Sequence, residues 1–458
     1  MKLISRRALC ALLAAGLLAL GTLAFTVLFF VRGGDWVVFS GSPHVYTGSN
    51  LDAGTVTDRA GQTLLTQKDG ERTYAGDPLL RRAALHLLGD RYGYIAGSVL
   101  GEYADLLVGY NPVTGVYGAD DGGSTLRLTI SAEAQTAALN ALGGRAGAVG
   151  VYNYKTGEIL CAVTSPTYDP DDVPDIENDT TGAYDGVYLN RLFQTTYVPG
   201  SIFKLVTAAA ALETIDDIET QTFNCPGVIT IGGDEIHCSG VHGAVTLEQA
   251  LAHSCNCAFA EIAQEVGAET LTEYAKKAGV LDSYKFDGIT TAPGSFDLQD
   301  AADSEVSWAG IGQYTNLVNP CGYMVFMGAI GGGGAAAKPY LAGAVVNSSG
   351  RTVYKPSVKM TDEMIKPETA ERLGEMMRNN VVTSYGAAQF GELTVCAKSG
   401  TAEVGEGLSP HATFSGFVAD SDYPLAFFVV VENAGSGSGV CAPIAATVLK
   451  ACAAAMDD

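Results

Sequence analysis

Apolar residues near the C-terminus recur with the spacing of β-strands. The segments ELTVCAKSGTAEV, HATFSGFVA and LAFFVVVEN are strand-like, and APIAATVLKACAAA follows them as a helix. Earlier in the chain, AGAVGVYNYKTGEILCAVTSP predicts two strands joined by a turn at residues 155–157. Strands at both ends of this region with helices between them predict an α+β domain with one mainly antiparallel sheet.

The residues between those strands have a helical pattern. We expect helices over residues 201–212, 247–266 and 271–279. Another helix, AEAQTAALNALG, precedes the first strand pair, and Ser131 is placed to cap it, with Glu133 in its first turn.

A long apolar stretch lies close to the N-terminus. Residues Ala8–Val31 contain no charged side chain and can cross a hydrocarbon core of about 30 Å as a helix. The stretch is longer than the apolar region of a cleaved export signal, which is the alternative. Lys2, Arg6 and Arg7 precede it, so the positive-inside rule predicts a cytoplasmic N-terminus and an extracytoplasmic remainder.

Three parts of the chain follow from these patterns. Residues 1–32 form the cytoplasmic N-terminus and transmembrane anchor, and residues 33–124 form a small module with short strands such as GTVTDR and one helical pattern, DPLLRRAALHLLGD. Residues 125–458 form the large α+β domain. With 458 residues and 47% hydrophobic content, the chain can bury a large core.

The charge balance narrows the set of partners. Aspartate and glutamate number 50 against 27 lysines and arginines, which gives a net charge of −23. No basic stripe is available to neutralise a phosphate backbone, so nucleic acid is not an expected partner.

Ten cysteines include one inside the apolar span, which leaves an odd number outside it. Cys225 and Cys238 flank VITIGGDEIH, a predicted hairpin with a Gly-Gly turn, and this arrangement permits a disulfide without requiring one. We interpret Cys255 and Cys257 as small buried side chains rather than nucleophiles. The spacing of the nearby histidines and cysteines matches no standard zinc pattern, so we expect no metal; these residues are His237, Cys238, His242, His253, Cys255 and Cys257.

The stretch VPGSIFKLVTAAAALE raises the first candidate for chemistry. Ser201 follows a Pro-Gly pair and opens a predicted helix, in which Lys204 at i+3 lies on the same face. A serine hydroxyl is a weak nucleophile, and a neutral amine beside it can take its proton. That role needs a lowered pKa at Lys204, which burial and nearby cations produce. Taken alone, the Ser201–Lys204 pair is equally consistent with a serine that only caps the helix.

Two further motifs follow in the chain. Ser254 and Asn256, two residues apart, place a hydroxyl and an amide on one side of a turn, although a polar helix start has the same pattern. In VCAKSGTAE, strand alternation turns Ser399 and Thr401 to one face. Gly400 between them leaves room for a ligand backbone, and Lys398 supplies a cation for an anionic substrate. The order of all three motifs is a stronger signal than any one of them.

With these motifs the sequence resembles the penicillin-binding proteins, from roughly Leu126 to the C-terminus. The matching motifs are Ser201-Ile-Phe-Lys204, Ser254-Cys-Asn256 and Lys398-Ser-Gly-Thr401. The anchor and the GTVTDRAG stretch resemble the start of monofunctional, class B members, and the short distance from the anchor to Leu126 leaves no room for a glycosyltransferase domain. Two positions depart from the family pattern: Ala53 stands where arginine is common, and Ser399 where threonine is frequent.

The resemblance implies a penicillin-binding transpeptidase fold with a helical subdomain and a D,D-transpeptidase that crosslinks peptidoglycan stem peptides ending in D-Ala-D-Ala. Ser201 would be the nucleophile, Lys204 its base, and Ser254 with Asn256 would relay the leaving-group proton and hold the peptide amide. β-Lactams would acylate Ser201. No cofactor is implied, and a membrane glycan polymerase is an expected partner.

The residues that would bind the substrate's terminal carboxylate are, by the same resemblance, those of the third motif: Lys398, Ser399, Gly400 and Thr401. A D-Ala-D-Ala carboxypeptidase, a serine β-lactamase and a non-catalytic β-lactam sensor or scaffold share these motifs and remain alternatives. A β-lactamase has no reason for a membrane anchor plus an N-terminal module. The sequence does not decide among elongation, division and sporulation.

Overall fold

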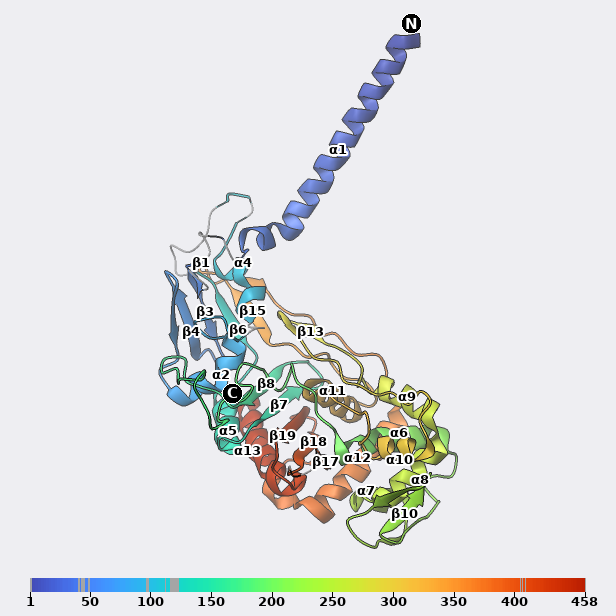
Figure 1. Ribbon diagram of the computed structural model, residues 1–458. Coiled ribbons are helices and arrows are strands. Elements are labelled where there is room, and N and C mark those ends of the chain that lie inside the picture. The colour runs from blue at the N-terminus through green and yellow to red at the C-terminus, as the bar shows by residue number, and fades with distance from the viewer. Residues whose placement is uncertain are drawn as a thin grey trace.

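A computed structural model describes residues 2–39, 42, 46–47, 50–95, 99–111, 113–115, 123–403, 405, 407 and 409–457. Helix α1 (Lys2–Val37) projects away from the body of the protein as one long helix (Figure 1). Within it, the segment Ser5–Gly34 is apolar and long enough to cross a membrane, and none of its most apolar window is buried. The span expected at Ala8–Val31 lies inside this segment.

Next to the end of α1 lies a six-stranded sheet, with strands in the order β16-β15-β6-β3-β4-β5 (Figure 1). Strands β3 and β6 are parallel and the other neighbours are antiparallel. The strands are β3 (Ala53–Thr57), β4 (Thr63–Lys68), β5 (Glu71–Tyr74), β6 (Thr125–Leu128), β15 (Ala342–Val346) and β16 (Thr352–Tyr354).

The boundary expected at residue 124 is therefore not a boundary of this sheet. Strands β6, β15 and β16 come from residues assigned to the large domain, and β15 covers the edge of β6 whose backbone N–H and C=O groups would otherwise be unpaired. Smaller elements complete this region: β1 (Tyr46–Thr47), β2 (Asn50–Leu51), α2 (Pro78–Leu88), α3 (Val99–Glu102) and α4 (Ala104–Leu107).

A second sheet forms the centre of the large domain. It has five antiparallel strands in the order β17-β18-β19-β7-β8, and it contains the three C-terminal strands and the strand pair expected from the sequence. The strands are β7 (Gly147–Asn153), β8 (Ile159–Ser165), β17 (Val395–Ala402), β18 (His411–Val418) and β19 (Leu425–Val431).

Helices cover both faces of the central sheet, so β7, β8 and β19 are buried along their whole length. Phe427 packs in the cluster that contains α5 (Ala132–Leu142) and α13 (Gly437–Asp457), while its neighbour Phe428 packs in the cluster that contains α11 (Pro320–Gly331). Neighbouring side chains thus enter different cores, as the two-residue period of a strand requires. Helix α13 is also apolar and long enough to span a membrane, but half of its apolar window is buried against the sheet.

The remaining helices form a separate helical part beside strand β17 (Figure 1). It contains the short hairpin β10–β11 and the two-stranded pair β9–β12. The elements are α6 (Lys204–Thr214), β9 (Phe223–Cys225), β10 (Val228–Ile231), β11 (Asp234–His237), β12 (Gly243–Val245), α7 (Leu247–Ala252), α8 (Asn256–Val266), α9 (Ala268–Lys277), α10 (Asp303–Gly310) and α12 (Pro367–Asn380). The short pair β13 (Lys285–Phe286) and β14 (Ile289–Thr290) lies nearer the N-terminal sheet, beside β15 (Figure 1).

The structure confirms the predicted cap of α5 and contradicts the single helix predicted over residues 247–266. Ser131 caps α5 as expected, since its Oγ accepts a hydrogen bond of 3.2 Å from Ala134 N. The single helix expected over residues 247–266 is wrong, because α7 ends at Ala252 and α8 begins only at Asn256. Ser254 lies in the break with φ of +52°, a left-handed conformation that no helix contains.

Candidate active site

Ser201 lies on a short 3-10 turn, Gly200–Phe203, that leads directly into α6. Gly200 has φ of +54°, and a Cβ atom there would lie 2.6 Å from the Thr401 carbonyl oxygen. Only glycine allows the turn to approach strand β17 this closely. The result is that Ser201 and the end of β17, which are far apart in sequence, lie side by side.

Lys204 reaches back from α6 to the serine. Its Nζ lies 3.1 Å from Ser201 Oγ, 2.6 Å from Ser254 O and 2.7 Å from Asn256 Oδ1. The side chain is fully buried. Burial, and then the charge of Lys398, hold the pKa of Lys204 well below that of an ordinary lysine. A neutral amine at this position can accept the serine proton.

The break between α7 and α8 explains why Ser254 and Asn256 both face Lys204. A continuous helix would rotate two such residues about 200° apart, onto opposite faces. The left-handed Ser254 instead directs its carbonyl and its hydroxyl to the lysine, the latter at 3.3 Å, while Asn256 begins α8 with its amide oxygen on the same side. Asn256 Nδ2 donates to His237 O at 2.8 Å, which fixes the orientation of the amide.

Lys398 occupies the other side of Ser254. Its Nζ donates to Ser254 Oγ at 3.0 Å and to Ser399 O at 2.9 Å, and the side chain is fully buried. Burial lowers the pKa of Lys398 to about 7. The Ser254 hydroxyl therefore lies within hydrogen-bond distance of two buried lysine amines.

Ser399 and Thr401 alternate along β17 with the buried Lys398 and Gly400, so they share the more open face, as the strand pattern predicts. Tyr385 was not found by sequence reasoning. Its hydroxyl accepts hydrogen bonds from Ser399 N at 3.1 Å and from Ser399 Oγ at 3.0 Å. No motif marks this tyrosine, because it reaches β17 only through the π-helical turn that follows α12.

Gly400 packs closely against neighbouring segments on the side where a Cβ atom would project. A Cβ atom there would collide with Thr413 Oγ1 and lie 2.8 Å from Pro199 O and 3.1 Å from Ile202 Cγ2. The space that this Cβ atom would take is filled by the turn that carries Ser201 and by β18. The glycine allows the turn and the strand to pack against each other.

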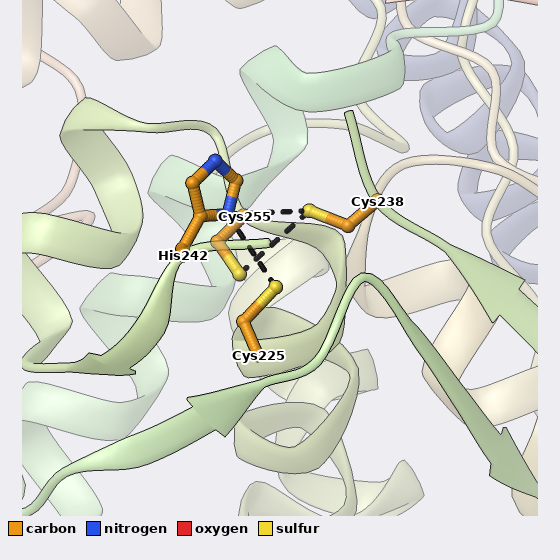
Figure 2. Close-up of side chains that lie close together, drawn as sticks. All are labelled: Cys225, Cys238, His242 and Cys255. Atoms are coloured by element: carbon orange, nitrogen blue, oxygen red, sulfur yellow. Dashed lines mark hydrogen bonds between the residues drawn. The ribbon is translucent and has the colours of Figure 1, made fainter. Parts of the chain in front are cut away.

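The cysteines and histidines near Asn256 form a cluster that the sequence spacing did not reveal. Cys225, Cys238, His242 and Cys255 place one potential metal-binding atom each within 4.8 Å of the others (Figure 2). Cys225, considered only for a hairpin disulfide, belongs to this group, whereas His237, His253 and Cys257 do not. All ten cysteines are free thiols in the structure, so the disulfide that the hairpin permits is not formed. Cys255 and Cys257 are fully buried, as expected.

A serine hydroxyl within hydrogen-bond distance of a buried lysine amine is the arrangement of enzymes that form serine acyl-enzymes. Comparison with known proteins agrees with this class. The family described as "Penicillin binding protein transpeptidase domain" matches residues 147–450. The chain belongs to this penicillin-binding protein transpeptidase family.

Named relatives share most of the chain. A peptidoglycan D,D-transpeptidase, PbpA of Mycolicibacterium smegmatis, is 26% identical over 371 residues, which cover 73% of each protein. Stage V sporulation protein D of Bacillus subtilis is 29% identical over 314 residues, 65% of this chain and 47% of that protein.

Solved structures confirm the expected fold. The D,D-transpeptidase domain of a peptidoglycan glycosyltransferase from Eggerthella lenta has a TM-score of 0.75 at 27% identity and covers 87% of this chain and 97% of that one. Penicillin-binding protein A from M. tuberculosis, solved as an imipenem acyl-enzyme complex, has a TM-score of 0.75 at 25% identity, with 89% and 98% covered.

Proposed function

We propose that this protein is a peptidoglycan D,D-transpeptidase of cell-wall synthesis that works through a serine acyl-enzyme and is acylated by β-lactams. The contact between Lys204 Nζ and Ser201 Oγ, at 3.1 Å inside a buried cluster, carries the proposal. The relatives named as transpeptidases and the acyl-enzyme structures in the family support it.

The first step is attack on the substrate. Ser201 Oγ attacks the carbonyl carbon of the penultimate D-Ala, and its proton passes to the neutral Lys204 amine. Backbone N–H groups of Ser201 and Thr401, which the close packing at Gly200 brings together, stabilise the oxyanion. Each such donor is worth about 2.7–4 kcal/mol.

The second step releases the terminal D-Ala. The C–N bond breaks, and the leaving amine takes a proton from Ser254 Oγ, which regains one from Lys204, 3.3 Å away. Asn256 holds the substrate amide and, through Oδ1, the lysine. The terminal carboxylate binds to the hydroxyls of Ser399 and Thr401, in the positive field of Lys398.

An amine of a neighbouring stem peptide then attacks the acyl-enzyme ester, forms the crosslinking amide and frees Ser201. A β-lactam takes the place of the D-Ala-D-Ala end, and its ring opens on the serine. The ester persists because the β-lactam leaving group remains tethered to it and blocks the acceptor.

The apolar helix α1 anchors the protein in the cytoplasmic membrane in this proposal, with the catalytic domain on the extracytoplasmic side where stem peptides are found. The lysine and arginines that precede the span support this orientation. A membrane glycan polymerase, which would supply the glycan strands that carry the stem peptides, is a partner proposed on family resemblance alone.

Labelling with a fluorescent penicillin tests the proposal. The full chain, purified in detergent, is expected to bind the label in one-to-one amount, and Ser201→Ala is expected to bind none. Ser349→Ala, in an exposed turn, is the matched control and should label like the native chain. A native chain that stays unlabelled would contradict the assignment of Ser201 as the nucleophile. Rapid hydrolysis of the β-lactam would instead identify the protein as a β-lactamase.

A second assay separates the transpeptidase from a carboxypeptidase. The native chain is given a D-Ala-D-Ala peptide with and without an amine acceptor, and both products are quantified. The proposal expects the amide product to dominate when the amine is present. Release of hydrolysed peptide alone would leave the acyl-enzyme chemistry intact but contradict the transfer step.

A further inference from the structure

Four potential metal ligands converge beside the turn that carries Ser254. Their side chains come from four separate places and point toward a common centre (Figure 2). Cys225 ends β9, Cys238 follows β11, His242 precedes β12, and Cys255 precedes α8. In the sequence they form the pattern C-x12-C-x3-H-x12-C. Because two of the gaps are twelve residues long, the sequence does not show that these four residues are neighbours. They meet only once the β10–β11 hairpin has folded.

The distances within the cluster fit a tetrahedral zinc ion. Zn–S bonds of about 2.3 Å and Zn–N bonds of about 2.0–2.1 Å separate two sulfurs by about 3.8 Å and a sulfur from a nitrogen by about 3.6 Å. Cys238 Sγ lies 3.8 Å from Cys255 Sγ. His242 Nδ1 lies 3.4 Å from Cys225 Sγ and 3.5 Å from Cys238 Sγ. These three distances match a tetrahedral coordination shell, and the remaining pairs of ligand atoms lie within 4.8 Å of one another.

Backbone N–H groups point at two of the sulfurs. Asn256 N donates to Cys238 Sγ at 3.3 Å, and Ala258 N donates to Cys255 Sγ at 3.4 Å. Both donors belong to the first turn of α8, where N–H groups lack partners within the helix. Such donors stabilise thiolates, the form in which cysteine binds a metal.

The segment that supplies three of the ligands has little core of its own. Along β10 and β11 only Ile236 is buried, and the other side chains are partly or fully exposed. Small units with so little apolar packing are commonly held by a metal or a disulfide. A metal ion or a disulfide at this place would fix the β10–β11 hairpin to the start of α8.

A disulfide accounts for the cluster less well than a metal. Three sulfurs cannot all pair with one another, so one thiol would stay unused. The imidazole of His242 has no part in a disulfide, yet its Nδ1 faces two of the sulfurs. Three thiolates and one imidazole are a standard set for structural Zn²⁺, and four protein ligands leave no open position for catalysis.

We propose that Cys225, Cys238, His242 and Cys255 bind one Zn²⁺ as a closed structural site. Binding replaces the protons of the three thiols, which pass to solvent, and the oxidation state of sulfur and metal does not change. Because Cys255 lies between Ser254 and Asn256, the ion holds the turn whose carbonyl and amide oxygens bind Lys204. The effect on catalysis rests on the function proposed above, whereas the metal content does not.

Metal analysis of the full chain, purified in detergent without chelator, tests the site. We expect about one zinc per chain in the native protein and a loss of at least about tenfold in Cys238→Ser and His242→Ala. Cys321→Ala, a buried cysteine of α11 that lies outside the cluster, is the matched control and should keep its zinc. Equal zinc in all variants would place the metal elsewhere and overturn the proposal.

Cobalt substitution tests the ligand set without relying on the folding of a variant. Zinc is removed from the native protein with a chelator and replaced by Co²⁺, and the absorption spectrum should show thiolate charge transfer and tetrahedral ligand-field bands. A native chain that neither retains nor takes up zinc overturns the proposal. So does a disulfide within this cluster found by mass spectrometry of the non-reduced native chain.

Penicillin labelling then measures the effect on the active site. A displacement of the turn by about 1 Å would slow acylation by about 10²-fold, so the zinc-free native protein should label that much more slowly and recover with Zn²⁺ but not with Mg²⁺. Unchanged labelling after zinc removal would contradict the positioning role. Ser201→Ala, which should hold zinc but take no label, separates the two proposals: zinc without labelling in the native chain refutes only the enzymatic function.

Discussion

The close packing of the serine turn against β17 makes Gly400→Ala an informative substitution. The added methyl group would collide with Thr413 Oγ1 of β18, and on the side of the serine turn it would lie 2.8 Å from Pro199 O, where ordinary contact begins at 3.4 Å. The carbonyl must therefore retreat by about 0.6 Å, and Ser201, two residues further on, moves with it. Because a misplacement of about 1 Å costs about 10²-fold in rate, we expect the maximal rate of acylation to fall ten- to twentyfold.

The assay is the rate of fluorescent-penicillin labelling at several concentrations, which separates the affinity for the β-lactam from the maximal rate. A shifted serine lowers the maximal rate and leaves the affinity nearly unchanged. Overpacking should also cost about 1–3 kcal/mol of the free energy of unfolding, measured by denaturation.

Gly322→Ala in α11 is the control for adding a methyl group to a buried glycine. Its Cβ would lie 3.8 Å from Gly279 O and 3.9 Å from Asn319 Cβ, which are ordinary contacts. We expect its acylation rate to equal that of the native chain. If Gly400→Ala instead kept the maximal rate and lost affinity, the methyl group would be meeting the ligand, and our reading of this glycine would be refuted.

Three further predictions use other parts of the structure. The second-order rate of acylation should fall as pH rises through about 7, because Lys398, whose pKa burial lowers to about 7, loses the charge that attracts the β-lactam carboxylate. A carboxyl-esterified β-lactam should show no such fall, and an equal fall with both compounds would contradict this role. Thr246→Ala removes the capping box with Gln249 at the start of α7 and should cost about 1 kcal/mol in urea denaturation; an unchanged midpoint would show that the cap contributes nothing. Leu449→Ala, fully buried in α13, should cost about 2–5 kcal/mol, whereas a negligible loss would argue against α13 as a core helix.

Periodicity predicted the elements whose apolar pattern is local. Strands β17, β18 and β19 and the helix α13 were predicted from it, because the strands bury most of their residues and α13 is apolar along its length. The same pattern concealed the break between α7 and α8, since apolar residues continue with helical spacing on both sides of Ser254. What distinguishes the break is the left-handed conformation of that serine, which tertiary contacts with Lys204 stabilise.

Features that join distant segments could not be predicted. Strands β15 and β16 carry no sign in the sequence that they complete a sheet begun near residue 53, because pairing partners are chosen by the fold. The three motifs did indicate which residues meet around Ser201. They did not indicate Tyr385, which has no motif, or the cysteine cluster, whose members lie more than ten residues apart except for Cys238 and His242.

The late strands of the N-terminal sheet affect how the protein folds as it is made. Strands β3, β4 and β5 emerge early, yet the sheet lacks its last members until residues 342–354 have been synthesised. Until then β6 has an unpaired edge, a surface that is prone to wrong pairing. The sheet can therefore be completed only after the helices α6 to α11 have been synthesised. A truncation before residue 342 should remain vulnerable to proteases in the N-terminal sheet as well as in the catalytic domain.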